Sequence, residues 1–399
     1  MNKQDFPVFK TYPDLVYLDS GASAQKPQIV LETMMEFAQK KYANVHRGSY
    51  YLSEMATMAY EKARRTVAEF LGARYEDIIF VRGATEAINL VAQTYGHTLK
   101  AGDEVLISEA EHHSNIVPWQ LLAAERDINL KYVNVLPSGE LNLNDFENKL
   151  TDKTKLVAIT QMSNVLGLLN PIDEIVKKAH KAGAKVLIDG CQAIVHTPID
   201  LRKSDIDFYA FSGHKLYGPT GIGVLYGKSE IMNTLPPWQG GGDMIKQVKL
   251  TGSTFADTPA RFEAGTPAII ESVGLMSALN YVKSIGYDKM IDNENQVMHL
   301  LKEALNSMKR VQVLGDLAPK KSLVCFNLKG IHPQDVAMVL SEQNVAVRVG
   351  HHCAQPITEK YGVTASIRVS LGLYNDGDDI SKFLNALKKA EKILGSVRK

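Results

Sequence analysis

The sequence predicts an α/β protein with a large, mainly parallel sheet and a smaller α+β domain towards the C-terminus. Two observations predict this fold class: strand-like and helix-like segments alternate between about residues 75 and 260, and the pattern changes after the stretch EAGTP at 263–267. A length of 399 residues suits about two to three folding units. The 45% share of hydrophobic residues is enough for a large core.

The middle of the chain predicts a strand–helix–strand unit. Apolar runs at 155–160 and 185–189 predict buried strands, and 171–183 predicts a helix that Pro171 starts and Gly183 stops. Such a unit requires a parallel sheet. Further strands are expected at 104–108, 207–212 and 223–227, and an amphipathic helix at 54–71.

Beyond residue 267 the segments follow a different order, which predicts the smaller α+β domain. A helix is expected near 268–286, followed by a strand at 322–328, a helix at 332–343 and strands at 345–350 and 365–371. The closing helix from Asp378 has one apolar face, and packing on the small domain's sheet explains it better than a membrane surface. We divide the chain into an N-terminal segment that joins the small domain (1–20), a large domain (21–267) and a small domain (268–399).

Composition and charge favour a cytoplasmic protein that acts on small molecules. The formal net charge is +1, so no net field attracts nucleic acid or an anionic membrane. The first ten residues lack the apolar run of a signal peptide, and no stretch approaches the ~18 apolar residues that span a bilayer. Three cysteines without paired spacing indicate reduced thiols.

Polar residues follow the predicted strands, where an open parallel sheet binds its ligands. The candidates at these strand ends are His112, His113, Asn164, Asp189, Gln192, Ser212, His214 and Lys215. For a lone lysine, a turn cap would be the simpler interpretation. Together the residues suit pyridoxal 5'-phosphate: an amine to bond its aldehyde, a carboxylate for its ring nitrogen, and a hydroxyl and an imidazole for its phosphate. Thr85, in a glycine-containing turn before a helix, would complete the phosphate site.

In the segment RVGHHCAQP at 348–356, Cys353 directly follows His351 and His352. From these residues alone Cys353 is a metal ligand, a redox thiol, a nucleophile or a small buried side chain. Arg348 and Arg368 lie in predicted strands of the small domain, where the alternatives are surface-edge positions or a clamp on a substrate α-carboxylate. Cys325 lies in an apolar strand and is expected in the core, and Cys191 is expected near the cofactor without a role.

Five motifs in the same order extend the argument: EHHSNIVPW, IDGCQA, FSGHKLYGPTGIG, RFEAGTP and RVGHHCAQP. With them the chain resembles the SufS/CsdA-type (group II) cysteine desulfurases of the class V aminotransferase superfamily, from residue 17 to residue 375. The resemblance implies the fold-type I, aminotransferase-like architecture and a homodimer. It also implies conversion of L-cysteine to L-alanine, with a persulfide left on Cys353 and sulfur supplied to iron-sulfur cluster assembly.

The resemblance also implies a role for each candidate. Lys215 would hold the cofactor and move the substrate's Cα proton, Asp189 would keep the ring nitrogen protonated, and His112 would stack on the ring. Gln192 would bind the ring's phenolic oxygen, and Asn164 with Arg368 would hold the substrate. The phosphate would be bound by Thr85, Ser212 and His214, and by Thr266 of the other subunit.

Departures from the family pattern bear on its partners. Tyr50 and Tyr51 stand where relatives often carry His and Thr, and Phe255 and Ala260 where they usually carry tryptophan. Gln334 stands where relatives that serve a zinc-bearing SufU-type acceptor tend to have His, which leaves SufU-type and SufE-type acceptors open.

Several rival functions accompany this interpretation. Within pyridoxal-phosphate enzymes they are a selenocysteine lyase, a cysteine sulfinate desulfinase and an aminotransferase. Outside them they are a sulfur carrier that uses only Cys353 and a metal site. The metal site would use His112, His113, His351, His352 and Cys353, although a second ligand pair at zinc-finger spacing is missing.

Overall fold

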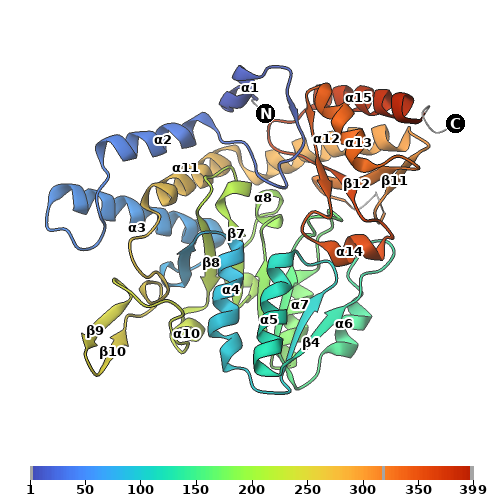
Figure 1. Cartoon of the computed structure of the whole chain (residues 1–399). Helices are drawn as coiled ribbons and strands as arrows, with labels where there is room; N and C mark the ends of the chain where they lie inside the picture. The colour runs from blue at the N-terminus through green and yellow to red at the C-terminus, as the bar shows by residue number, and fades with distance from the viewer. Residues whose placement is uncertain (1–2, 317–319, 396–399) are drawn as a thin grey trace.

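A seven-stranded mixed sheet forms the centre of the molecule in the computed structural model, which describes residues 3–316 and 320–395 (Figure 1). Its spatial order is β2 (Ile78–Val81), β8 (Gly223–Gly227), β7 (Phe208–Ser212), β6 (Lys185–Asp189), β5 (Thr154–Thr160), β3 (Glu104–Ser108) and β4 (Asn129–Val133). Strands β3 to β7 are parallel to one another, whereas β8 is antiparallel to both of its neighbours. The α/β fold class with a mainly parallel sheet is confirmed.

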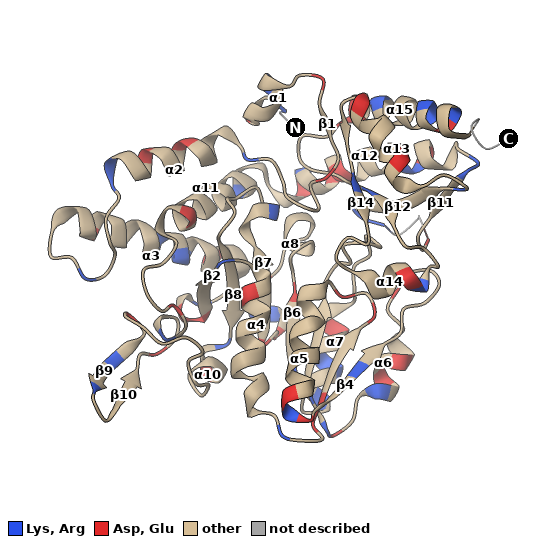
Figure 2. Ribbon diagram, viewed as in Figure 1, with Lys and Arg blue, Asp and Glu red and all other residues tan. Residues whose placement is uncertain are grey.

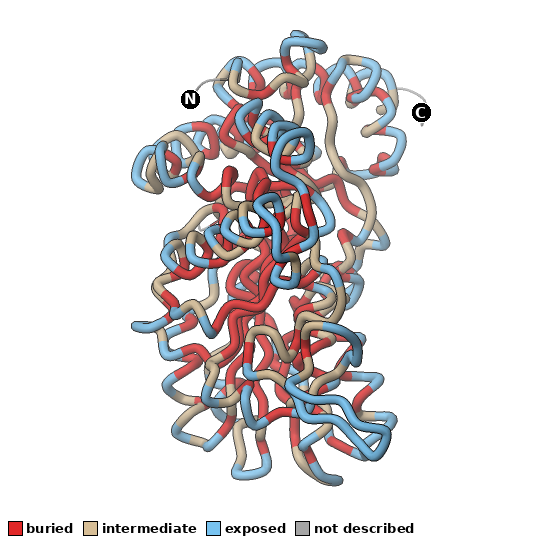
Figure 3. Tube along the Cα trace, turned by 90° about the vertical axis from the view of Figure 1, so that its left-hand side faces the viewer, coloured by how far each residue is buried: buried red, intermediate tan, exposed pale blue. Residues whose placement is uncertain are grey.

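Helices cover both faces of this sheet, and its strands are almost fully buried except for the edge strand β4 (Figures 1 and 3). The longer helices between its strands are α4 (Ala84–Thr94), α5 (Val117–Arg126), α6 (Leu143–Lys149) and α7 (Ile172–Lys181). Next to the β2 edge, α2 (Gln28–Lys40), α3 (Tyr51–Leu71) and α11 (Ile269–Ile285) pack together. Burial on both faces explains why these strands appear in the sequence as continuous apolar runs.

A second, four-stranded antiparallel sheet lies in the C-terminal part, in the order β11 (Val311–Val313), β12 (Leu323–Leu328), β15 (Ser366–Ser370) and β14 (Arg348–Gly350). The helices α12 (Tyr287–Asn306), α13 (Pro333–Glu342) and α15 (Gly377–Gly395) pack with it around a second apolar core. The smaller α+β arrangement is therefore present. The domain boundaries stay a prediction, and buried side chains of α11 lie in the core of the larger sheet.

The predicted strand at 345–350 is divided. Its first part, β13 (Val345–Ala346), pairs in parallel with β1 (Val16–Tyr17) near the N-terminus, and its second part is β14. The pairing with β1 brings the N-terminal segment beside the smaller sheet, as Figure 2 shows. After β1, the chain runs to the carboxyl ends of the parallel strands of the main sheet, where the site lies.

Two features outside the sheets complete the fold. A hairpin of β9 (Ile245–Lys249) and β10 (Gly252–Phe255) projects from the molecule, and its strands are mostly exposed (Figure 1). Basic and acidic residues are interspersed along the surface helices (Figure 2). Over residues 3–316 and 320–395, none of the helices combines the length and apolar character that a bilayer crossing requires.

Candidate active site

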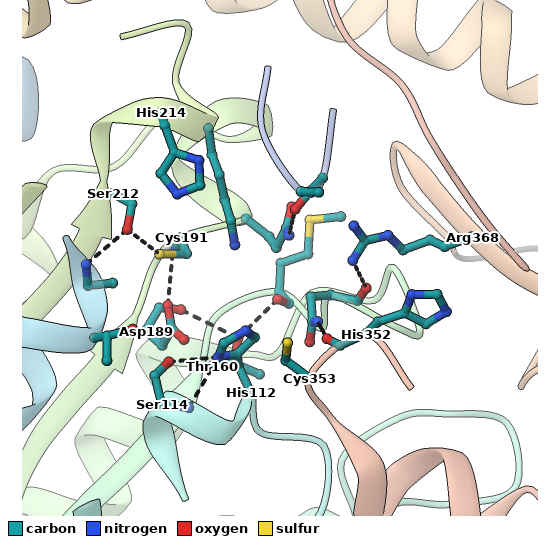
Figure 4. A pocket seen from close by; sticks show the side chains of 18 of the residues that line it. His112, Ser114, Thr160, Asp189, Cys191, Ser212, His214, His352, Cys353 and Arg368 are labelled. Atoms are coloured by element: carbon teal, nitrogen blue, oxygen red, sulfur yellow. Dashed lines mark hydrogen bonds between the residues drawn. The ribbon is translucent and has the colours of Figure 1, made fainter. Parts of the chain in front are cut away.

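A cavity of about 210 Å³ lies at the carboxyl ends of the parallel strands, between the two sheets. Apart from His113 and Thr266, the residues predicted to bind cofactor or substrate line it together with Cys353: Thr85, His112, Asn164, Asp189, Gln192, Ser212, His214, Lys215, Arg348, Cys353 and Arg368. Figure 4 shows Cys353 and Arg368, from the C-terminal part of the chain, on one side of the cavity, and residues from the large sheet such as Asp189 on the other. Sequence reasoning missed Gly21 and Ala22, which reach the cavity because β1 pairs with β13.

Asp189 lies at the floor of the cavity, at the last position of β6. Its side chain is buried and accepts a hydrogen bond from the backbone N–H of Cys191 at 3.0 Å. Burial raises the pKa of Asp189, and the nearby Lys215 charge opposes that rise. A carboxylate in this position is suited to hold a proton on a nitrogen base placed beside it.

An anion site is built where α4 begins. The backbone N–H of Ala84 donates to Ser212 Oγ at 2.9 Å, which brings the end of β7 to the N-terminus of α4. A Cβ on Gly83 would lie only 3.2 Å from Ser212 Oγ, so glycine here allows the end of β7 to approach α4 closely. Burial, and next the charge of Lys215, lowers the pKa of His214 to about 4, so the imidazole is neutral at pH 7. Free N–H groups at a helix N-terminus suit a phosphate.

His112 faces the cavity with a fixed tautomer. Its Nδ1 accepts the backbone N–H of Ser114 at 3.1 Å and contacts Ser114 Oγ at 2.7 Å (Figure 4). Burial, and next the charge of Lys215, lowers the pKa of His112 to about 3. The ring is therefore neutral, with its proton on Nε2.

Arg348 and Arg368 lie directly opposite each other on β14 and β15. Arg368 is buried, donates to the backbone carbonyl of Asn164 at 3.1 Å and contacts Asp19 Oδ1 at 3.3 Å. Its Nε has no hydrogen-bond partner among the described residues. Because like charges opposite each other in a sheet are destabilising, this pair favours an anion between or beside the two guanidinium groups.

Cys353 is the half-buried thiol of the cavity. Arg348 Nη2 lies 3.9 Å from its Sγ. Gln192 approaches from the large-domain side, where its Nε2 donates to the backbone carbonyl of Gly21 at 2.8 Å. Thus one cavity holds a thiol, an amine, a buried carboxylate and two guanidinium groups.

Comparison with known proteins identifies the family. The model of the aminotransferase class-V family matches residues 16–383. A cysteine desulfurase of Dickeya dadantii (strain 3937) is 47% identical, over 98% of this chain and 97% of its own. The chain belongs to the cysteine desulfurase family of class-V aminotransferases.

Solved structures of cysteine desulfurases superpose on the whole chain. CsdA of Escherichia coli, described as an S-sulfonic acid form, matches with a TM-score of 0.92 and 37% identity over 99% of both chains. The apo enzyme of Thermococcus onnurineus matches with a TM-score of 0.94 and 37% identity, over 99% of this chain and 97% of that one. The predicted family, its group II type and its fold are confirmed.

The cofactor of this cysteine desulfurase is pyridoxal 5'-phosphate, and the cavity fits it. Lys215 would bond its aldehyde, Asp189 would hold its ring nitrogen, and the anion site at the start of α4 would take its phosphate. The start of α4 most directly suits the phosphate, because Ala84 and Thr85 of its first turn line the cavity beside Ser212. Bound there, the cofactor supplies an electron sink for reactions at the α-carbon of an amino acid.

Two sequence-based ideas have different outcomes. The rival metal site gains no support, because no group of three or more His, Cys, Asp or Glu that could hold a metal is found within residues 3–316 and 320–395.

Thr266 lies in an exposed surface hollow with Phe80, Arg82 and Trp238, outside the cavity of its own chain. Its proposed role in phosphate binding therefore requires a second subunit.

Proposed function

We propose that this cysteine desulfurase converts L-cysteine to L-alanine and keeps the sulfur as a persulfide on Cys353. One observation carries the proposal: Lys215 and Cys353 line the same cavity, although one follows a strand of the large sheet and the other follows a strand of the small sheet. An amine that acts at the α-carbon and a thiol that acts at the sulfur are what this reaction needs.

The arginine pair would bind the substrate through its carboxylate. Arg368 is fixed by Asn164 and Asp19, which leaves its unpartnered Nε free to donate to a carboxylate oxygen. This contact would orient the α-carbon towards Lys215. The amide of Asn164 donates to the backbone carbonyl of His352 at 2.6 Å, so Asn164 also joins substrate binding to the thiol segment.

The remaining polar residues would control protons. The amine of Lys215 takes the proton from the substrate's α-carbon, while Asp189 holds a proton on the cofactor's ring nitrogen. The neutral ring of His112 covers the cofactor without adding a charge, since its pKa is lowered to about 3. Gln192, which also lines the cavity, would donate to the ring's phenolic oxygen.

The thiolate of Cys353 would complete the reaction by attacking the substrate's sulfur. A bond forms between the two sulfur atoms as the bond from Cβ to sulfur breaks. The electron pair of the broken bond stays with the substrate carbon, which takes a proton and becomes the methyl group of alanine. Arg348, 3.9 Å from Sγ, is placed to stabilise the thiolate.

The test compares two cysteine variants of the holoenzyme. Cys353→Ala should keep the visible absorbance of the bound cofactor but lose alanine production from L-cysteine by at least about 100-fold, since burial raises the pKa of Cys191, the other thiol that lines the cavity, to about 12. Cys325→Ala, a control at a buried strand position, should keep it. In the wild type, mass spectrometry should find the added sulfur on the peptide that contains Cys353. Undiminished alanine production by Cys353→Ala would refute the nucleophile assignment.

The homodimer is part of this proposal because Thr266 cannot serve the cavity of its own chain. A second copy would bring Thr266, exposed beside Trp238 and Arg82, to the phosphate site of its partner. Large apolar side chains are exposed on the nearby helices α2 and α3, including Met35, Tyr51 and Met58. Such a surface is typical of an interface between subunits.

Mixed dimers would test this arrangement. Lys215→Ala and Thr266→Ala homodimers should both be impaired, the first completely. In a dimer that pairs the two variants, one site has an intact Lys215 and receives an intact Thr266 from the partner. Activity should therefore return after subunit exchange. If Thr266 acted within its own chain, no complete site would form and mixing would restore nothing.

The sulfur on Cys353 would pass to an acceptor protein of the SufU or SufE type and on to iron-sulfur cluster assembly. We place this reaction in the cytoplasm, where the three free thiols would stay reduced. Gln334, exposed in the first turn of α13, lacks the imidazole that a zinc-bearing acceptor could use. Alanine production with each type of acceptor would decide, and stimulation by neither would contradict the handover.

A further inference from the structure

The segment that carries Cys353 has an unusual backbone. His352 and Cys353 have φ angles of 54° and 57°, in the left-handed region, and Gly350 has 127°. Two successive non-glycine residues in this conformation persist only where surrounding contacts impose it. The contacts that hold the turn therefore also decide where the thiol lies.

His113 makes two of these contacts. Its backbone N–H donates to the carbonyl of Cys353 at 2.7 Å. Its ring Nε2 accepts the backbone N–H of Gln355 at 3.0 Å, at the start of α14 (Gln355–Lys360). His113 thus binds the chain at two points that directly follow the nucleophile's side chain, at the carbonyl of Cys353 and at the N–H two residues later.

The ring of His113 can accept only while Nε2 is unprotonated. Burial, and next the charge of His351, lowers the pKa of His113, which favours the neutral ring at pH 7. The accepting Nε2 places the ring proton on Nδ1. Because His113 follows His112 directly, the short helix η4 (His113–Asn115) begins at the residue that holds the thiol segment, next to the residue that faces the cofactor site.

We propose that His113 is a positioning residue that holds the Cys353 turn closed over the cavity, through its backbone N–H and its ring Nε2. This inference rests on the proposed function, in which Cys353 is the nucleophile. His113 would act through Cys353 without touching the substrate. The closed turn presents the thiol to the substrate's sulfur, and loss of the ring contact lets the segment open.

Two substitutions of the holoenzyme separate the ring's acceptor from its volume. His113→Phe keeps a ring but removes the acceptor, whereas the amide oxygen of His113→Gln can still accept from Gln355. His97→Phe, at another half-buried histidine, serves as the control. The measurements are the rate at which iodoacetamide alkylates Cys353 without substrate, the cofactor absorbance, and kcat and KM for L-cysteine.

For His113→Phe we expect faster alkylation of Cys353, by about two- to tenfold, as one hydrogen bond is lost. We expect kcat to fall by a similar factor, with KM and the cofactor absorbance unchanged. His113→Gln and His97→Phe should stay within about twofold of the wild type, a smaller change than the lost hydrogen bond is expected to give. Unchanged alkylation in His113→Phe would overturn the proposal, and so would equal effects of Phe and Gln.

A separate measurement covers the case in which His113→Phe does not fold. Hydrogen exchange of the Gln355 amide in the wild type should then be slow, and an exchange rate equal to that of a free peptide would overturn the proposal. The alkylation rate reports the position of the segment whatever the reaction is. Failure of the proposed function would instead appear as alanine production by Cys353→Ala.

Discussion

Arg368→Lys tests whether the buried guanidinium binds the substrate carboxylate. Arg368 is 2% exposed and donates to Asn164 at 3.1 Å and to Asp19 at 3.3 Å, while its Nε has no partner among the described residues. With substrate bound, Nε and one terminal nitrogen can donate together to a carboxylate. A lysine can offer one compact ammonium in the same place, so one of these two bonds is lost.

The expected loss follows from the charge on both partners. A hydrogen bond to a charged group contributes about 1.5–3 kcal/mol, which corresponds to a decrease in kcat/KM of roughly 10- to 100-fold. The loss should appear mainly in KM, because the carboxylate is bound equally before and during the reaction. The buried position also forces the substituted ammonium to keep the contact with Asn164 or leave that carbonyl unpaired.

The assay is alanine production over a range of L-cysteine concentrations, with the cofactor absorbance recorded for each protein. Arg310→Lys is the matched control, since Arg310 is a half-exposed arginine whose nearest acid, Glu391, is 3.7 Å away. It should leave both constants unchanged. A kcat/KM of Arg368→Lys within about threefold of the wild type, below the loss expected for one such bond, would refute carboxylate binding by Arg368.

Two further predictions concern lysines. Lys215→Ala should abolish both the visible absorbance of the bound cofactor and alanine production, and absorbance that survives gel filtration would contradict covalent binding at Lys215. Lys320 is buried, donates to the carbonyls of Leu166 and Leu314 at 2.6 and 2.7 Å, and has a pKa that burial lowers to about 8. Its folded pKa lies below its unfolded value, so the charged lysine costs stability below pH 8, and this cost, about 3 kcal/mol, disappears as the pH rises towards ~10.4. Urea unfolding should show that rise in the wild type relative to Lys320→Met, and parallel pH profiles of the two proteins would contradict it.

Strand positions could be predicted from the sequence where both faces of a strand are buried. The predicted segments 104–108, 185–189 and 223–227 coincide with β3, β6 and β8. Continuous apolar runs bounded by polar or glycine residues fix such strands locally. The same local signal predicts that most candidate residues lie in one cavity, because polar side chains at the carboxyl ends of parallel strands must gather at one edge.

Features that depend on distant contacts could not be predicted in this way. The apolar run of β8 predicts a strand, but its place between β7 and β2 depends on pairing with β2, which lies far earlier in the chain. The division of the strand at 345–350 depends on β1, more than 300 residues earlier in the chain. That pairing places Asp19 beside Arg368 and brings Gly21 to the cavity.

Ionisation, more than proximity, separates the three thiols of the chain. Cys191 lines the cavity next to Asp189, yet burial, and next the Asp189 charge, raises the pKa of its thiol to about 12. Burial raises the pKa of Cys325 to about 11 on its strand. At pH 7 the ionised fraction of each of these two thiols is therefore at most about one in 10⁴. Attack on sulfur requires the ionised form, the thiolate. Cys353, in contrast, is half-buried, and the guanidinium of Arg348 lies 3.9 Å from its sulfur. The buried thiol of Cys191 can therefore lie beside the cofactor site without competing with Cys353 for the substrate's sulfur.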